Sequence, residues 1–316
     1  MKVLWVGNFR ESYCSEVHFA REMESLGHEV CRFQEPVGGG IHSTLIEIEH
    51  CAEGCDLVMF TRTWGLPPEA TAMWRRLESR GTKTASYHLD LYVPLARGAN
   101  IETDPFWTTQ YVFTPDGNPE SADYFAARDI NHIWSPPAVV SDECATVMPG
   151  RFRPEYAYDV VFVGSRGYHS EWPWRKELLD WLETTYRERF HRFGGDVPPG
   201  PTRGQDLNDL YASARVVVGD SCMARPDTRY FSDRPFEGYG RGAYMLFPQI
   251  DLLEEMIGAY PSYTAGDLIG LRAGIQDALE ADSLDRDDTR ERLSLHIAEH
   301  HTYRDRFAAA LFAMGF

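Results

Sequence analysis

Short apolar runs alternate with longer stretches of helical periodicity through the first half of the chain. The runs are rich in β-branched and aromatic residues, as expected of buried strands. Predicted strands are residues 3–7, 28–33, 56–61, 82–89, 111–114 and 132–137, with helices over 11–26, 41–52 and 119–127 and one opening at Pro67. This alternation predicts a mainly parallel sheet covered by helices on both faces.

The periodicity lapses over residues 136–158, which contain four prolines, and then restarts as though a second chain began. Predicted strands of this second half are residues 159–165, 190–195, 215–221 and 243–249, with helices over 174–186, 206–214, 235–242 and 287–314. We therefore expect an α/β protein of two tandem Rossmann-like domains, residues 1–140 and 155–295. The last helix, with residues 296–316 as its returning part, is expected to cross back to the first domain.

Composition and charge narrow the classes of function. The 316 residues are 43% hydrophobic and 25% charged, which is ordinary for a globular protein. A formal net charge of −17 repels nucleic-acid phosphates and anionic lipid. No apolar stretch approaches the roughly 20 residues of a membrane helix, and the six cysteines are irregularly spaced. We expect a soluble, cytoplasmic protein with reduced cysteines and no membrane partner.

Chemistry is expected after the strands, because ligands of doubly wound sheets bind at the carboxyl ends of the strands. In the second half, Gly164, Ser165 and Arg166 follow one predicted strand, Arg175 lies downstream, and Asp220 ends another strand. A glycine turn with backbone N–H groups and arginines suits an anion. The alternative for Gly164 is a tight turn without a ligand.

The segment 230–248 is more specific. Arg234 stands three residues before Glu237 at a predicted helix start, and Gly240 and Gly242 follow before a buried strand. A guanidinium and a helix start can address a diphosphate, while a carboxylate can accept hydrogen bonds from sugar or ribose hydroxyls. The alternative is that Arg234 and Glu237 only pair across one helical turn.

Four sequence blocks together resemble a known family. They are DVVFVGSRGYHSEWPWR, DLYASARVVVGDS, SDRPFEGYGRGAYMLFP and the closing HTYRDR, within residues 156–312. These blocks resemble the spore-maturation-type (CgeB-like) glycosyltransferases, which are related to the glycogen-synthase-like group with the two-domain GT-B fold.

The resemblance implies a nucleotide-sugar donor site in the second domain. Residues implied to line the donor diphosphate are Gly164, Ser165, Arg166, Arg175 and Arg234, with Asp220 beside them and Glu237 on the nucleotide-sugar hydroxyls. It implies a UDP-sugar donor and no further cofactor or catalytic metal. The broader group often has a second glutamate eight positions after the first, where this chain has Met245.

The first domain would bind the acceptor. Its best polar cluster contains His88 and Asp90, with Arg62 after the preceding strand, while Gly7 and Asn8 follow the first strand. In an inverting transfer, His88 or Asp90 could take the proton of the acceptor hydroxyl. In a retaining transfer the donor phosphate can do so, and Asp90 then only orients the acceptor. Alternatively, both side chains are structural.

Three functional hypotheses follow. The first is transfer of a sugar to a hydroxyl of a small molecule or glycan. The second is transfer to a hydroxymethylated base in DNA, because residues 62–97 carry a local net charge of +3. The third is a nucleotide-sugar-binding protein without catalysis. A dinucleotide-dependent oxidoreductase is disfavoured, because no GxGxxG follows the first predicted strand.

Overall fold

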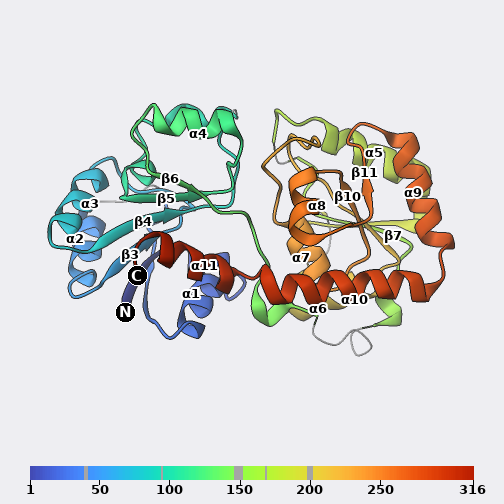
Figure 1. The fold of residues 1–316 in the computed structure, drawn as a ribbon, viewed down its shortest axis with the longest axis horizontal. Coiled ribbons are helices and arrows are strands. Elements are labelled where there is room, and N and C mark those ends of the chain that lie inside the picture. The colour runs from blue at the N-terminus through green and yellow to red at the C-terminus, as the bar shows by residue number, and fades with distance from the viewer. Residues whose placement is uncertain (39–41, 94, 146–151, 168, 198–201) are drawn as a thin grey trace. The chain divides into compact units, whose positions relative to one another are not determined.

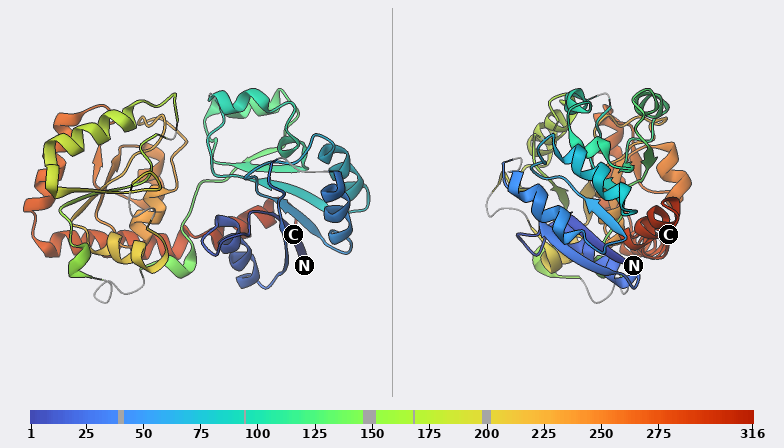
Figure 2. Two further views of the ribbon diagram at one scale, coloured as in Figure 1. Left: turned by 180° about the vertical axis from the view of Figure 1, so that it is seen from behind. Right: turned by 90° about the vertical axis from the view of Figure 1, so that its left-hand side faces the viewer.

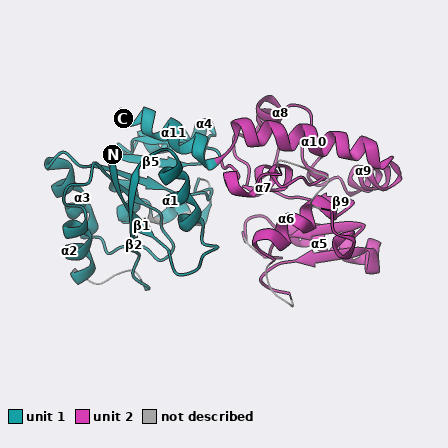
Figure 3. Ribbon diagram, turned by 90° about the horizontal axis from the view of Figure 1, so that it is seen from below, with its two compact units in different colours: residues 1–136, 303–316 teal, residues 137–302 magenta. Residues whose placement is uncertain are grey.

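The computed structural model describes residues 1–38, 42–93, 95–145, 152–167, 169–197 and 202–316. The chain forms two compact units. Unit 1 comprises residues 1–136 and 303–316, and unit 2 comprises residues 137–302, as coloured in Figure 3.

Unit 1 is built on a parallel six-stranded sheet of order β2-β1-β3-β4-β5-β6. Its strands are β1 (Lys2–Gly7), β2 (Glu29–Gln34), β3 (Leu57–Phe60), β4 (Lys83–Tyr87), β5 (Tyr111–Thr114) and β6 (His132–Trp134). Its helices are α1 (Ser15–Ser25), α2 (His42–Cys51), α3 (Ala70–Ser79), α4 (Pro119–Ala126) and α11 (Tyr303–Ala313), with 3-10 turns at Ala96–Asn100 and Pro105–Thr108.

Alternate residues of β1 face the two sides of this sheet, as a pleated strand requires. Leu4 and Val6 join the apolar core beneath α2 and α3. Trp5 points to the other face, where its ring lies 6.0 Å from Phe19 of α1 and 5.2 Å from Phe307 of α11. Helices α1 and α11 lie side by side in Figure 1 and in the left view of Figure 2. The carboxyl-terminal segment therefore completes the core of unit 1.

Unit 2 has a five-stranded parallel sheet of order β11-β10-β9-β7-β8. Its strands are β7 (Val160–Val163), β8 (Phe190–Phe193), β9 (Val216–Val218), β10 (Met245–Pro248) and β11 (Ser262–Tyr263). Its helices are α5 (Trp174–Tyr186), α6 (Gly204–Ser213), α7 (Arg234–Gly240), α8 (Asp251–Ile257), α9 (Leu268–Glu280) and α10 (Ser283–His300), with 3-10 turns at Ser141–Glu143, Pro154–Tyr156 and Arg187–Arg189.

Helices cover both faces of the second sheet. Phe162 and Val218 pack with residues of α5 and α9, including Leu178 and Ile275, in one apolar core. On the other side α10 contacts α7 and α8. Both sheets thus have the doubly covered parallel arrangement that predicts ligand binding at the carboxyl ends of their strands.

The structure confirms the predicted α/β class with two parallel-sheet units and corrects several bounds. The single helix predicted over residues 287–314 is two helices, because the chain leaves helical geometry at His301 and Thr302 pairs with Val139. The units divide between Pro136 and Pro137, at the start of the stretch 136–158 where the periodicity lapses, and the returning segment begins at Tyr303. Helices α8 and α9 and strand β11 match no element predicted from the sequence.

Two general properties can be read from the described residues. None of their helices is long and apolar enough to cross a membrane. The six cysteines are all free thiols.

Candidate nucleotide-sugar and acceptor sites

A buried ion pair lies at the carboxyl ends of β7 and β9 in unit 2. Arg175, in the first turn of α5, donates from Nε to Oδ2 of Asp220 at 2.9 Å, and both side chains are almost fully buried. Trp172 Nε1 also donates to the Asp220 carboxylate, at 3.2 and 3.3 Å. Asp220 thus fixes the direction of the Arg175 guanidinium.

Arg234, the first residue of α7, extends to the end of β7. Its Nε donates to the carbonyl of Val163 at 3.3 Å, and its guanidinium lies 5.8 Å from the ring of Phe162. Gly164 has a φ of +144°, and a Cβ added there would be 2.6 Å from an Arg234 nitrogen. Position 164 therefore requires glycine both for its backbone conformation and for the approach of Arg234.

The two arginines make this edge of the sheet electropositive. Burial and the nearby Arg234 lower the pKa of Arg175, while Asp220 acts in the opposite direction. Burial raises the pKa of Asp220, against the effect of Arg175. Two guanidinium groups face one buried carboxylate, so the arrangement suits a further anion.

Glu237 lies one turn into α7 and is partly buried. Within the described part of the chain, no group hydrogen-bonds or pairs with its carboxylate. Burial and the neighbouring carboxylates Asp233 and Glu143 raise its pKa to about 7, against Arg241 and Arg234. The helical-turn pair between Arg234 and Glu237, considered from sequence, does not form. The carboxylate is instead available to a ligand hydroxyl.

The remaining predicted donor residues differ in position. Ser165 is half-buried beside Gly164. The Arg166 guanidinium pairs with Asp180 and, at 3.1 Å, with Glu183, both on α5. The charge of Arg166 is therefore neutralised by carboxylates of α5. Arg234 is a better candidate than Arg166 for contact with a diphosphate. Met245 is buried in β10, so this position supplies no second carboxylate.

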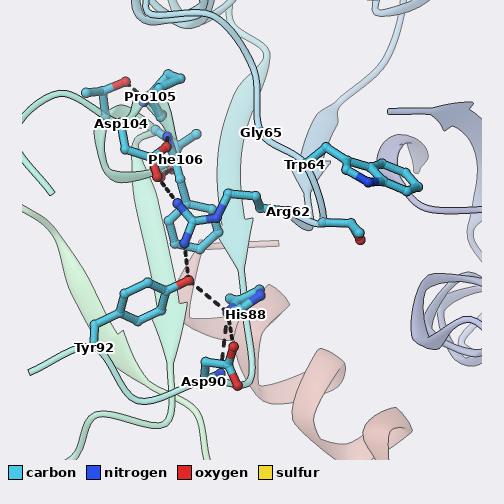
Figure 4. Close-up of polar contacts among 12 residues, drawn as sticks. Arg62, Trp64, Gly65, His88, Asp90, Tyr92, Asp104, Pro105 and Phe106 are labelled. Atoms are coloured by element: carbon cyan, nitrogen blue, oxygen red, sulfur yellow. Dashed lines mark hydrogen bonds and ion pairs between the residues drawn. The ribbon is translucent and has the colours of Figure 1, made fainter. Parts of the chain in front are cut away.

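In unit 1 a chain of polar contacts joins the ends of β3 and β4 (Figure 4). Arg62 pairs with Asp104 and donates to the hydroxyl of Tyr92. The Tyr92 hydroxyl lies 2.8 Å from Nδ1 of His88, and an Asp90 carboxylate oxygen lies 3.9 Å from the same nitrogen. The structure thus brings three residues singled out from sequence together, and adds Tyr92 and Asp104.

Asp116 holds the backbone of the loop that carries Tyr92. It is buried and accepts backbone N–H groups of Tyr92 at 2.9 Å and Val93 at 3.0 Å, as well as the Thr114 hydroxyl at 2.7 Å. Burial raises its pKa to about 6 despite these donors. The position of Tyr92 is therefore fixed through its backbone as well as through its hydroxyl.

Two buried glutamates at the ends of β1–β3 were missed by the sequence analysis. Glu35 accepts three backbone N–H groups, from Thr63 at 2.8 Å, Trp64 at 3.1 Å and Gly65 at 2.6 Å. Glu16 packs against Gly7, where an added Cβ would lie 2.7 Å from Cγ of Glu16. Burial raises the pKa of both carboxyls. The position of Glu35 directly after a strand was the available sequence signal.

Gly7 and Asn8, the other predicted acceptor residues, form the turn after β1. The Gly7 carbonyl accepts the N–H of Glu35 at 2.7 Å, and the Asn8 side chain accepts the N–H of Arg10 at 3.4 Å. The Arg10 guanidinium lies 5.1 Å from the ring of Trp64. Both residues therefore shape the loop that carries Arg10.

The net positive window of residues 62–97 is largely neutralised in the fold. Arg76 and Arg80 both pair with Glu49, and Arg75 pairs with Glu78. Lys83 binds the carbonyl of Met314. The Arg97 side chain lies outside the described part of the structure.

No group of three or more His, Cys, Asp or Glu side chains within the described residues is arranged to hold a metal ion.

Comparison with known proteins gives a family match for one part of the chain. Residues 165–312 match the family model described as glycosyl transferase-like. This region covers most of unit 2 and all of α11 except its last residue, Ala313. No curated protein sequence matches the chain.

Solved structures resemble the whole chain. A UDP-forming α,α-trehalose-phosphate synthase from Burkholderia vietnamiensis superposes with a TM-score of 0.62 and 9% identity, covering 99% of this chain and 100% of the other. An E. coli structure described as trehalose-6-phosphate bound with UDP-2-fluoro glucose gives 0.63 and 9%, covering 98% and 99%. A Burkholderia xenovorans synthase in complex with glucose-6-phosphate gives 0.52 and 10%, covering 85% and 76%.

At these identities the likeness establishes the fold. The chain has the GT-B architecture of two Rossmann-like domains. Together, the family match and the fold support a GT-B glycosyltransferase.

Proposed function

We propose that the protein is a glycosyltransferase that binds a nucleotide-sugar donor, a UDP-sugar, in unit 2 and transfers the sugar to a hydroxyl of an acceptor bound by unit 1. The observation that supports this most directly is the unit 2 anion site. There Arg175, held by Asp220, and Arg234, lying against Gly164, meet at the carboxyl edge of the sheet. The glycosyl transferase-like family match includes Arg175, Asp220 and Arg234.

The site residues suit departure of a nucleoside diphosphate. In glycosyl transfer the sugar carbon becomes oxocarbenium-like while negative charge grows on the leaving diphosphate. Fixed guanidinium groups stabilise that charge at little reorganisation cost, because the protein already holds them in place. Glu237 would accept hydrogen bonds from hydroxyls of the sugar or ribose, and it does so best when ionised.

The acceptor end of the reaction is assigned to the polar cluster of unit 1. Asp90, next to His88 at the end of β4, would orient the acceptor or, in an inverting transfer, take its proton. In a retaining transfer the donor phosphate takes the proton, and Asp90 keeps only the orienting role.

The pairing of the basic residues favours a small-molecule or glycan acceptor over DNA. A DNA-modifying enzyme has to neutralise phosphates with cations that its own carboxylates do not already neutralise. Arg75, Arg76 and Arg80 are each bound to a glutamate. A hydroxymethylated duplex therefore remains the second candidate, to be excluded by direct assay.

Calorimetric titration with UDP tests the donor site. Arg234→Ala is expected to weaken UDP binding by about 10- to 100-fold, since a hydrogen bond to a charged group contributes about 1.5–3 kcal/mol. The matched control is Arg189→Ala. Arg189 pairs with Asp159 at 2.6 Å, at the amino end of the same sheet, and its loss removes the same charge without touching the site.

Equal UDP affinity in wild type and Arg234→Ala would refute the diphosphate assignment. Release of UDP from UDP-sugars, with and without candidate acceptors, then separates an enzyme from a binding protein. A chain that binds UDP-sugars but neither hydrolyses nor transfers them is the non-catalytic alternative.

A further inference from the structure

Three charged residues stand immediately before three neighbouring strands of unit 2. Arg189 precedes β8, Asp159 precedes β7 and Arg215 precedes β9. Their side chains meet at the amino edge of the sheet, where Asp159 accepts from Arg189 at 2.6 Å and from Arg215 at 3.0 Å. The strands of this sheet are parallel, so this edge is opposite to the one that carries the proposed donor residues.

A pocket of about 420 Å³ lies at this amino edge. Helices α5 and α9 line it with Tyr186, Arg272 and Gln276. Arg189 and Arg215 also belong to its lining. The volume is within the range of about 300–1,000 Å³ that is typical of small-molecule sites. Three guanidinium groups in one pocket of this size favour a ligand with negative charge.

The carboxylates of the protein leave part of this positive charge without a partner. Asp159 is shared by two arginines, and Arg215 also donates to a backbone carbonyl in the last turn of α9. Glu280, a carboxylate of the lining, accepts from Gln276 at 2.9 Å. The Arg272 guanidinium has no hydrogen bond or ion pair with any residue that the structure describes.

Tyr186 supplies a neutral donor in the same pocket. Its ring meets Trp181 edge-on at 5.8 Å, and its hydroxyl makes no hydrogen bond with another described residue. Burial raises the pKa of this hydroxyl, while the guanidinium groups of Arg272 and Arg189 act in the opposite direction. The hydroxyl is therefore protonated at neutral pH and can donate to a ligand.

From this pocket we propose a second ligand site, separate from the donor site, that binds a phosphate group, either free or as the monoester of a small molecule. Arg272 and Arg189 pair with phosphate oxygens, and the Tyr186 hydroxyl donates to another. A phosphate monoester has three terminal oxygens and a charge of about −1.5 to −2 at pH 7, so it can accept from all three groups at once. The proposal does not depend on the glycosyltransferase function.

The alternative is that the arginines only stabilise the fold. The carboxyl end of a helix carries partial negative charge, and Arg215 offsets it at α9 by binding the carbonyl of Leu279. Arg272 belongs to the second turn of the same helix, away from that end. Neither a helix end nor a carboxylate therefore accounts for Arg272, which makes this residue the one to test.

Calorimetric titration of the full chain with inorganic phosphate and with ribose 5-phosphate tests the site. We expect saturable binding that Arg272→Gln weakens about 10- to 100-fold, the effect of losing a hydrogen bond between charged groups. Tyr186→Phe keeps the ring and should weaken binding about 3- to 10-fold. Tighter binding of ribose 5-phosphate would identify the ligand as a phosphorylated metabolite, and equal affinities would identify it as phosphate itself.

Arg32→Gln is the matched control, because it removes an equal charge from a surface pair with Glu24 in unit 1. Phosphate affinity in this variant should equal that of wild type. The absence of saturable binding in wild type, or equal affinity in wild type and Arg272→Gln, would overturn the proposal. Loss of phosphate binding in Arg234→Ala but not in Arg272→Gln would also overturn it, since the phosphate would then occupy the donor edge of the sheet.

Discussion

At the scale of single residues, the proposed donor site depends on a glycine that leaves space for an arginine side chain. Gly164 combines a φ of +144° with an Arg234 nitrogen 2.6 Å from the position of an added Cβ. The side chain of alanine would occupy the place of the guanidinium, and its backbone would be strained.

We therefore expect Gly164→Ala to lower UDP affinity about as much as Arg234→Ala does, roughly 10-fold or more. The double variant should be little weaker than either single variant, because both remove the same contact. Calorimetry on the three proteins checks this. Additive losses would mean that Gly164 and Arg234 act independently.

Asp116 gives a second prediction at this scale, about pH. Its folded-state pKa of about 6 exceeds the ordinary value of 3.8, so the folded protein binds this proton more tightly than the unfolded chain. The contribution of Asp116 to the free energy of unfolding is therefore fully present below about pH 4 and is lost as pH rises through about 6.

In Asp116→Asn the amide oxygen can still accept both backbone N–H groups, and the amide nitrogen can donate to Thr114. Urea unfolding should then show the variant gaining stability relative to wild type between pH 4 and pH 7, with a plateau above. Other carboxyls titrate in both proteins and cancel in the difference. A difference that does not change with pH would contradict the raised pKa.

At the scale of elements, the loop after β3 is held by one carboxylate. Glu35 accepts the N–H groups of residues 63–65 and so orders the segment that carries Arg62 and Trp64. Glu35→Gln removes one of the two acceptor oxygens, and a buried N–H left without a partner costs about 1–3 kcal/mol.

We expect faster amide hydrogen exchange over residues 61–66 in Glu35→Gln, together with a higher KM for the acceptor. Glu24→Gln is the control, since Glu24 pairs with Arg32 on the surface at 2.8 Å. Exchange over residues 61–66 as slow as in wild type would show that the loop is ordered by other contacts.

The elements also show how far the sequence could be interpreted. The periodicity predicted residues 111–114 and 174–186 with the observed bounds of β5 and α5, because burial imposes the period directly. It did not predict the break at His301, since the apolar stripe continues into α11 and the break depends on the distant pairing of Thr302 with Val139. Local pattern carries no information on such long-range contacts.

In the candidate sites too, local sequence pattern identified some residues, while long-range contacts could not be predicted. Arg234 and Glu237 were identified because they stand together in one segment at a predicted strand and helix boundary. The pairing of Arg175 with Asp220 spans 45 residues, and that of Arg62 with Asp104 joins two loops. Only the fold therefore shows which arginines are neutralised by carboxylates of the protein. Arg166, which pairs with Asp180 and Glu183, is an example.

At the scale of the whole molecule, the last helix belongs to the first unit. Phe307 of α11 lies 5.2 Å from Trp5, 5.4 Å from Phe19 and 5.3 Å from Tyr87, measured between ring centroids. We expect Phe307→Ala to destabilise unit 1 by about 3–5 kcal/mol, the usual cost of truncating a buried phenylalanine.

Thermal unfolding followed by calorimetry checks this expectation, with Phe312→Ala, which is 83% exposed on the same helix, as the control. UDP affinity at low temperature should be retained, because the donor residues all lie in unit 2. A melting profile like that of wild type would show that α11 contributes little to the core of unit 1.

The division of the chain between the units also has a consequence for protein engineering. Unit 2 is an insertion: unit 1 is interrupted after Pro136 and resumes at Tyr303. The two edges of the interruption adjoin in unit 1, where Arg306 Nε donates to the Pro136 carbonyl at 3.0 Å, and the ends of the inserted segment adjoin through the Val139–Thr302 pairing. Residues 137–302 can therefore be replaced by a short linker, or exchanged for the corresponding segment of another GT-B protein, without moving the ends of unit 1. A donor site could be transplanted in this way as one continuous cassette.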